Sequence, residues 1–162
     1  MMKNFDELEK LIRILKKKRM KVCIAESLTG GQVAYSFVKK EGASEIFDFS
    51  IVCYSNDSKR TFLNADKVIK KYGVVSTETA NIMLNKIQKF TSSKKRLRLS
   101  CTGYASQNLS DDNIEVGTVY IGVGVGAKSK IIEKKFQNKG RASIIKSTVK
   151  ELIYESVKIL SQ

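Results

Sequence analysis

The chain has 162 residues, of which 42% are hydrophobic and 28% are charged, a composition typical of one soluble globular domain spanning residues 1–162. No apolar stretch reaches the length of a membrane-spanning helix, and the first residues lack the features of a signal peptide, so we expect a cytoplasmic protein that does not associate with a membrane. The net charge of +14 comes from lysines that are dispersed over predicted solvent faces, and it gives nucleic-acid binding only weak support.

The predicted elements follow from hydrophobic periodicity and from turn residues. In chain order they are a helix over 5–18, a strand over 20–25, a helix over 31–40, a strand over 46–54, short helices over 58–63 and 66–71, a helix over 77–90, a strand over 96–101, a polar loop over 104–114, strands over 116–126 and 130–137, and a helix over 141–160. Ser76 is the predicted N-cap of the helix that begins at Thr77. The last two strands are joined by a turn over 127–129 and are expected to be antiparallel neighbours. This order predicts an α/β fold, a three-layer α/β/α sandwich with a mixed β-sheet.

The counts of cysteine and histidine limit the chemistry. Cys23, Cys53 and Cys101 lie far apart inside apolar runs, so we expect buried side chains rather than disulfides or a zinc site. The chain has no histidine, which excludes a Ser-His-Asp triad, a Cys–His pair and a histidine metal site. We expect no metal and no cofactor. Acid–base chemistry must then use Lys, Tyr, Asp or Glu with an adjusted pKa.

A polar segment, A-E-S-L-T-G-G, follows the first predicted strand at residues 25–31. Two interpretations are open. In one, Ser27 or Thr29 is an ordinary N-cap, and Gly30 and Gly31 let the helix pack on the sheet. In the other, Ser27 is a nucleophile and the N–H groups at the helix start stabilise an anion, either a phosphate or the oxyanion of acyl transfer.

A second polar segment, Y-S-N-D-S-K, follows the second predicted strand at residues 54–59. Tyr54 and Lys59 are therefore expected at the same sheet edge as Ser27. A nucleophilic serine needs a base, and in a chain without histidine Lys59 is the leading candidate, provided that burial or nearby positive charge lowers its pKa. Tyr54 can hold or relay a proton. The alternative is a solvated lysine and a strand-end aromatic residue with a hydrated hydroxyl.

Together these segments resemble the CinA C-terminal domain, the nicotinamide-nucleotide amidase (NMN deamidase) family, over about residues 6–160. The first segment is similar to the family's A-E-S-C-T-G-G, and V-C-Y-S-N-D-S-K at 52–59 is similar to V-T-Y-S-N-x-x-K. Weaker similarities lie at G-V-V-S-T (73–77), T-G-Y-A-S-Q (102–107), V-G-T-V (116–119) and K-G-R (139–141).

The resemblance implies deamidation of nicotinamide mononucleotide to nicotinic acid mononucleotide and ammonia, a step of pyridine-nucleotide recycling. It implies Ser27 as the nucleophile, with Lys59 and Tyr54 as its catalytic partners, and it implies a homodimer. The residues that it implies for substrate binding are Glu26, Thr29, Gly30, Gly31, Asn56, Thr102, Gly103 and Arg141. Within this set, residues 29–31 are expected at the phosphate or oxyanion site, residues 102–103 on the opposite wall, and Arg141 on the substrate phosphate.

The sequence departs from the family pattern at two places. Leu28 replaces a cysteine beside the nucleophile, and Y-A-S-Q-N at 104–108 replaces a glycine-rich Ile-Ala-Gly-Pro-Gly loop. The second departure keeps an alternative open, a catalytically altered or inactive nucleotide-binding module, associated with competence or DNA damage.

Overall fold

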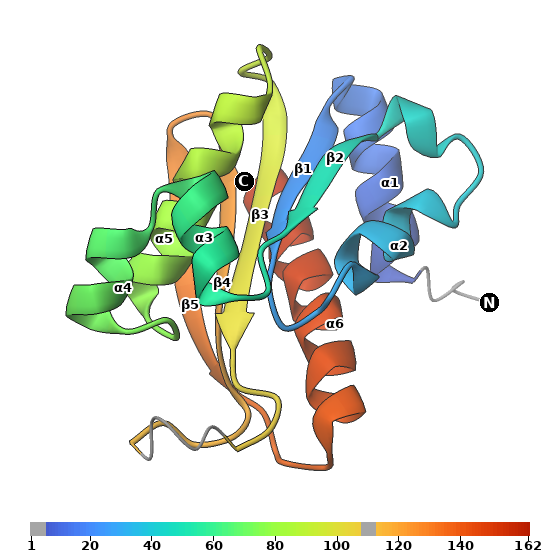
Figure 1. Ribbon diagram of the computed structural model, residues 1–162. Helices are drawn as coiled ribbons and strands as arrows, with labels where there is room; N and C mark the ends of the chain where they lie inside the picture. Colours follow the sequence, from blue (N-terminus) through green and yellow to red (C-terminus); the bar gives the residue numbers. More distant parts are fainter. Residues whose placement is uncertain (1–5, 108–112) are drawn as a thin grey trace.

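The computed structural model describes residues 6–107 and 113–162, and the strands among them form one mixed five-stranded sheet (Figure 1). The strands are β1 (Lys21–Glu26), β2 (Phe47–Val52), β3 (Arg96–Gly103), β4 (Thr118–Val125) and β5 (Lys128–Lys135), in the spatial order β2-β1-β3-β4-β5. β1 is parallel to β2 and to β3, whereas β4 is antiparallel to β3 and β5 is antiparallel to β4. The carboxyl ends of β1, β2 and β3 therefore meet at one end of the sheet, where open α/β sheets bind ligands.

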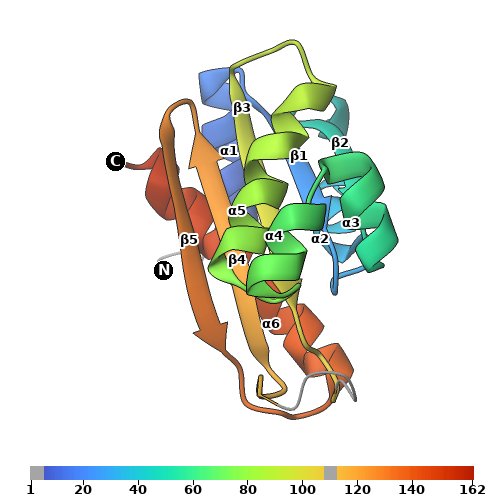
Figure 2. The ribbon, with the colours of Figure 1, turned by 60° about the vertical axis from the view of Figure 1, so that its left-hand side comes forward.

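Helices cover both faces of the sheet, as Figures 1 and 2 show from two directions. One face carries α1 (Glu7–Lys18), α2 (Gln32–Val38) and α6 (Arg141–Leu160), and the other carries α3 (Asn56–Leu63), α4 (Asp66–Tyr72) and α5 (Thr77–Lys86). β1 is buried on both faces: Val22 and Ile24 join the core beneath α1 and α6, whereas Cys23 and Ala25 join the core beneath α3 and α5. The predicted three-layer α/β/α sandwich is confirmed.

Most predicted elements lie where the sequence placed them, with differences at their ends. The helix predicted over 77–90 closes as a 3₁₀ turn over Ile87–Phe90, and a second 3₁₀ turn over Ala43–Glu45 was not predicted. The last hairpin turns more tightly than predicted, because β5 already begins at Lys128. Residue 5 of the first predicted helix and residues 108–112 of the predicted polar loop lie outside the described residues. The expected burial of the three cysteines is confirmed, and all three are free thiols.

The segment after β2 turns into a helix earlier than predicted. The strand predicted over 46–54 ends at Val52, and α3 begins at Asn56 rather than at residue 58. The cause is Ser55, whose Oγ accepts the N–H of Ser58 at 3.0 Å and caps the helix. The earlier start places Lys59 on the first turn of α3, on the buried side of that helix together with Leu63.

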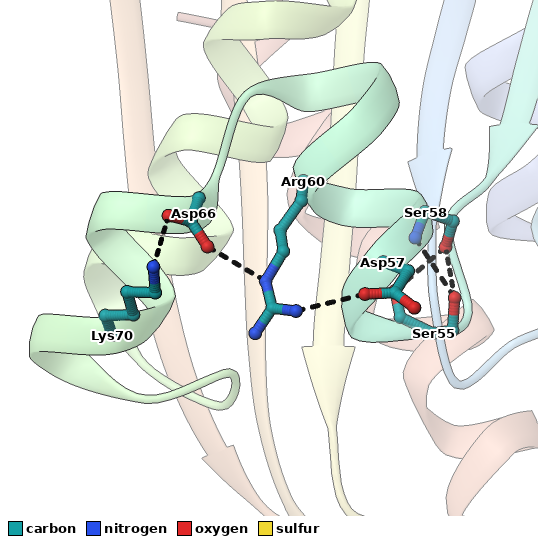
Figure 3. Close-up of polar contacts among 6 residues, drawn as sticks. All are labelled: Ser55, Asp57, Ser58, Arg60, Asp66 and Lys70. Atoms are coloured by element: carbon teal, nitrogen blue, oxygen red, sulfur yellow. Dashed lines mark hydrogen bonds and ion pairs between the residues drawn. The ribbon is translucent and has the colours of Figure 1, made fainter.

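Arg60 ties the outer side of α3 to α4, as Figure 3 shows. Its Nη1 lies 3.0 Å from Asp57 Oδ1, and its Nε lies 3.0 Å from Asp66 Oδ1. Lys70 Nζ lies 2.8 Å from the other oxygen of Asp66. Exposed ion pairs of this kind add little to the free energy of unfolding. Burial of Lys59 and Leu63 on the inner side therefore holds α3 on the sheet, and the Arg60 ion pairs link α3 to α4.

No helix within residues 6–107 and 113–162 combines the length and hydropathy needed to cross a bilayer.

Candidate active site

A cleft of about 310 Å³ opens at the carboxyl ends of β1, β2 and β3. Its walls include most of the residues that the sequence predicted for the site: Ser27, Tyr54, Asn56, Lys59, Thr102, Gly103 and Arg141. They come from the ends of neighbouring strands, from the first turn of α3 and from the start of α6. The fold therefore brings together side chains that are up to 114 positions apart in the sequence, from Ser27 to Arg141.

Ser27 and Lys59 form a direct pair in the buried wall of the cleft. Lys59 Nζ lies 2.9 Å from Ser27 Oγ, and the two residues are 1% and 7% exposed respectively. Burial lowers the pKa of Lys59 to about 8, because the ammonium form loses its hydration inside the protein. A lysine in this state has a substantial neutral fraction near pH 7, so it is able to accept a proton from the serine hydroxyl.

Two backbone carbonyls orient the amine of Lys59. Nζ lies 2.7 Å from the carbonyl oxygen of Cys53 and 3.1 Å from that of Tyr54. A neutral amine has two N–H bonds, and donating both to these carbonyls leaves its lone pair for Ser27. An ammonium group has three N–H bonds and donates the third to Ser27 Oγ. The site therefore accommodates both protonation states with the same heavy-atom positions.

Tyr54 contributes its backbone to Lys59 but directs its hydroxyl elsewhere. The side chain is 56% exposed at the rim of the cleft, where its hydroxyl oxygen accepts a hydrogen bond from Arg141 Nη2. Arg141 Nη1 also donates to Ser106 Oγ at 3.0 Å. In the described structure the Tyr54 hydroxyl makes no hydrogen bond to Ser27 or to the amine of Lys59, so the predicted third catalytic partner belongs to the rim rather than to the buried pair.

Thr102 and Gly103, which the family resemblance implies for substrate binding, also line the wall of the cleft. Thr102 Oγ1 donates to the carbonyl of Val74 at 2.8 Å, which fixes the loop before α5 against the end of β3. A Cβ atom on Gly103 would lie 2.7 Å from Val119 Cγ2 and 2.8 Å from the carbonyl oxygen of Thr118, so the glycine is required for the close approach of β4. This role is structural and is independent of substrate approach.

The departure from the family loop lies on the same wall. Tyr104 to Gln107 line the cleft, and residue 108 of the predicted loop lies outside the described residues. The backbone of Tyr104 is fixed to the start of β4, since its N–H donates to the carbonyl of Thr118 at 3.0 Å and its carbonyl accepts the N–H of Gly117 at 2.8 Å.

Glu26, Thr29, Gly30 and Gly31 are not in the wall of the cleft. The carboxylate of Glu26 is fully buried and accepts hydrogen bonds from Thr29 Oγ1 at 2.7 Å and from the N–H of Gly31 at 3.0 Å. It also accepts the N–H groups of Val33 at 3.1 Å and Ala34 at 2.9 Å, and the hydroxyl of Ser50 at 3.1 Å.

The start of α2 is therefore occupied by a side chain of the protein itself. Neither Ser27 nor Thr29 is the N-cap of α2: the N-cap is Gly31, at φ 97°, and it has no side-chain cap of its own. Because Glu26 takes the N–H groups of Gly31, Val33 and Ala34, these groups are not available to a phosphate or an oxyanion. The structure corrects the expected location of the anion site.

The N–H group of Leu28 is a candidate functional group that the sequence did not indicate. Its residue lines the cleft directly after Ser27, and its amide has no hydrogen-bond partner in the part of the chain that the structure describes. If Ser27 is a nucleophile, the N–H group of the next residue is a candidate donor to the oxyanion. The signal in the sequence is only its position directly after Ser27, because a backbone N–H has no signature in residue type.

Asn56 is exposed at the first position of α3 and lines the cleft. Its side chain has no partner among the described residues, so it is free to bind a ligand. Within those residues, no three Cys, Asp or Glu side chains gather in a way that would hold a metal ion.

Comparison with known proteins identifies the family of the chain. The family model described as "CinA C-terminal domain" matches residues 5–159. The chain is 36% identical over 155 residues to a "CinA-like protein" of Pseudothermotoga lettingae, which covers 94% of this chain but only 37% of that relative. The chain thus spans little more than a third of the length of this curated relative.

Solved structures share the fold. A competence-damaged protein (CinA) superfamily protein from Klebsiella pneumoniae superposes with a TM-score of 0.89 at 18% identity, covering 96% of both chains. The competence/damage inducible protein CihA from Agrobacterium tumefaciens gives a TM-score of 0.84 at 26% identity, again covering 96% of both chains. With the family model matching nearly the whole length, the chain belongs to the CinA C-terminal domain family.

Proposed function

We propose that the chain is an amidohydrolase that uses Ser27 as nucleophile and Lys59 as general base. The observation that carries the proposal is the buried Lys59–Ser27 hydrogen bond of 2.9 Å, formed by a lysine whose pKa burial lowers to about 8. An ordinary lysine on the protein surface has neither a buried hydrogen bond to a serine nor a lowered pKa. The absence of histidine leaves lysine as the available base.

The first chemical step forms an acyl-enzyme. Neutral Lys59 takes the Ser27 proton as Oγ bonds to the carboxamide carbon, and the carbonyl electron pair moves to oxygen. The N–H of Leu28 donates to this oxyanion. The oxyanion then collapses, Lys59 returns the proton to the amide nitrogen, and the C–N bond breaks to release ammonia and leave an ester on Ser27.

Hydrolysis of the ester completes the cycle. Lys59 takes a proton from water, and the resulting hydroxide bonds to the acyl carbon. The bond from that carbon to Ser27 Oγ then breaks, Ser27 regains a proton from Lys59, and the carboxylic acid leaves. Assistance by Tyr54 in delivering a proton to the departing ammonia stays a prediction: its hydroxyl oxygen accepts from Arg141 at the rim, and its own O–H remains available to donate.

The proposed substrate is nicotinamide mononucleotide, which combines a carboxamide with a phosphate. Arg141 is the basic side chain on the cleft wall besides Lys59, and it lies at the rim, where it is able to bind the phosphate while the carboxamide reaches Ser27. The volume of about 310 Å³ is at the lower end of the range for small-molecule sites. The homodimer and the cytoplasmic location that the family resemblance implies belong to the same proposal.

The proposal is tested by measuring ammonia release from nicotinamide mononucleotide with the wild type and with Ser27→Ala. Ser129→Ala is the matched control, because Ser129 is an exposed serine of β5 at the other end of the sheet. We expect turnover by the wild type and the control, and none above background by Ser27→Ala. Turnover by Ser27→Ala at the wild-type rate removes Ser27 from the nucleophile role.

A second candidate is a non-catalytic nucleotide-binding module. The observation that favours it is Tyr104, which stands on the cleft wall where the family has a glycine-rich loop. Calorimetry decides between the two: binding of pyridine nucleotides without release of ammonia supports the module.

A further inference from the structure

The buried carboxylate of Glu26 has no place in the chemistry above, although Glu26 directly precedes the proposed nucleophile. It is fully buried and is not part of the cleft wall. We propose that Glu26 is a positioning residue: its carboxylate holds the turn that presents Ser27 and the Leu28 amide, and it closes the N-terminus of α2 to the substrate phosphate. This inference rests on the proposed amidase function.

The hydrogen bonds of Glu26 leave no capacity for a ligand. Oε2 accepts from Thr29 Oγ1 and from the N–H groups of Gly31 and Val33. Oε1 accepts from the N–H of Ala34 and from Ser50 Oγ. A carboxylate has about four lone-pair sites, so five donors saturate it. A bound phosphate would have to compete with this carboxylate for the same N–H groups.

These bonds join the segments that carry the two reacting side chains. The carboxylate links the end of β1 to α2 and to Ser50 of β2. The backbone carbonyl of Glu26 accepts the N–H of Cys53 at 2.8 Å, and the carbonyl of Cys53 in turn accepts from Lys59 Nζ. Glu26 therefore fixes the strand end before Ser27 relative to the backbone that holds Lys59.

Besides the Glu26 carboxylate, the turn is held by the N–H of Gln32, which donates to the carbonyl of Thr29 at 3.0 Å, and by a contact of 3.3 Å between Thr29 Oγ1 and Cys101 Sγ. α2 has only seven residues, too few to be stable alone, and its N-cap Gly31 makes no side-chain cap. Within the turn, the N–H of Gly30 donates to the carbonyl of Ser27 at 3.0 Å. Loosening this unit would let Ser27 Oγ leave its position 2.9 Å from Lys59. A displacement of about 1 Å in a catalytic group is able to lower the rate about 100-fold.

Glu26→Gln tests the proposal, because it keeps the shape and removes half of the acceptor capacity. A carboxamide NH₂ at the Oε1 position sets one donor against another, the N–H of Ala34, and at the Oε2 position it does the same with the N–H groups of Gly31 and Val33. The hydroxyl groups of Thr29 and Ser50 can rotate away from the new donor, but the backbone N–H groups cannot. We expect kcat to fall about 10- to 100-fold while KM stays within about twofold.

Glu155→Gln is the matched control. Glu155 is also a buried carboxylate, 3% exposed, but it pairs with Lys130 and Lys158 toward the C-terminal end of α6, far along that helix from Arg141. It undergoes the same chemical change as Glu26→Gln and weakens ion pairs with two partly exposed lysines. We expect its kcat to stay near that of the wild type at a temperature where both variants are folded.

Amide hydrogen exchange gives a readout that does not depend on turnover. In Glu26→Gln we expect the N–H groups of Gly31, Val33 and Ala34 to lose protection, and in Glu155→Gln we expect them to keep it. If Glu26→Gln does not fold, Thr29→Val and Ser50→Ala each remove one donor, and we expect each to give a smaller loss of kcat and of protection.

The outcomes separate this inference from the proposed function. Wild-type kcat in Glu26→Gln, or an equal loss in Glu155→Gln, overturns the positioning role. An inactive wild type overturns the proposed amidase function instead. Amide exchange then still tests the positioning role of Glu26: unchanged protection of the N–H groups of Gly31, Val33 and Ala34 in Glu26→Gln overturns it. Chemical shifts of the same three N–H groups that move with inorganic phosphate in the wild type would show that the N-terminus of α2 is open after all.

Discussion

The pH dependence of turnover tests Lys59 most directly, because the proposed reaction requires its neutral form. With a pKa of about 8, about one Lys59 side chain in ten is neutral at pH 7, against about one in three thousand for a lysine at 10.5. Burial therefore raises the reactive fraction roughly 300-fold at pH 7. Between pH 7 and pH 9.5 the neutral fraction rises about tenfold and then levels off.

The assay measures kcat/KM for ammonia release from pH 7 to pH 9.5, a range above the second ionisation of the substrate phosphate. We expect a rise of about tenfold with a midpoint near pH 8. Lys59→Met should lose at least about 100-fold in kcat, the usual contribution of a general base. Lys67→Met, at an exposed lysine of α4, should behave as the wild type. A flat profile over this range, or activity that survives in Lys59→Met, refutes the assignment of Lys59 as the base.

Three further predictions use other parts of the structure. The pKa of Lys59 is lower in the folded chain than the unfolded value of 10.5, so the unfolded chain binds more protons between about pH 8 and 10.5. The free energy of unfolding of the wild type should therefore rise relative to that of Lys59→Met, by at most about 3 kcal/mol, as the pH rises through this window. Urea titrations of both proteins at pH 7 and pH 10.5 measure this change. Tyr54→Phe removes the hydroxyl that Arg141 contacts at the rim, so KM should rise severalfold with little change in kcat; a loss of about 100-fold in kcat would instead make Tyr54 a proton carrier. Gly103→Ala should destabilise the fold by about 1–3 kcal/mol in urea unfolding, because the added Cβ meets Val119 and the backbone of Thr118; an unchanged midpoint would show that β4 moves aside freely.

The parts of the site that the sequence predicted are those that depend on local pattern. The run V-C-I-A reads as a buried strand because Val22 and Ile24 face one core and Cys23 and Ala25 face the other. Polar residues directly after two such strands then belong at one end of the sheet. This is enough to predict that Ser27 and Lys59 lie close together, and the absence of histidine makes Lys59 the leading candidate for a base beside Ser27.

The contacts that were not predicted depend on how the chain turns back on itself. Glu26 precedes the N-cap Gly31 by five positions, which is not the spacing of a capping box, and its carboxylate reaches the N–H groups of α2 only because the turn folds over it. The contact between Arg141 and Tyr54 spans 87 positions and requires α6 to start beside the end of β2. Neither arrangement has a signature in residue type or periodicity.

Backbone groups explain why one departure from the family pattern matters less than the other. The proposed oxyanion donor is the N–H of Leu28, and replacement of the family's cysteine by leucine leaves that N–H in place. The acceptors that orient Lys59 are likewise the carbonyls of Cys53 and Tyr54 rather than their side chains. The 104–107 wall, by contrast, carries Tyr104 where the family has isoleucine and Ser106 where it has glycine, and both residues line the cleft. In the proposed mechanism the contacts of Ser27 and Lys59 are therefore made largely to the main chain and tolerate substitution nearby, so we expect a change in specificity to arise from Tyr104 and Ser106 rather than from the Ser27–Lys59 pair.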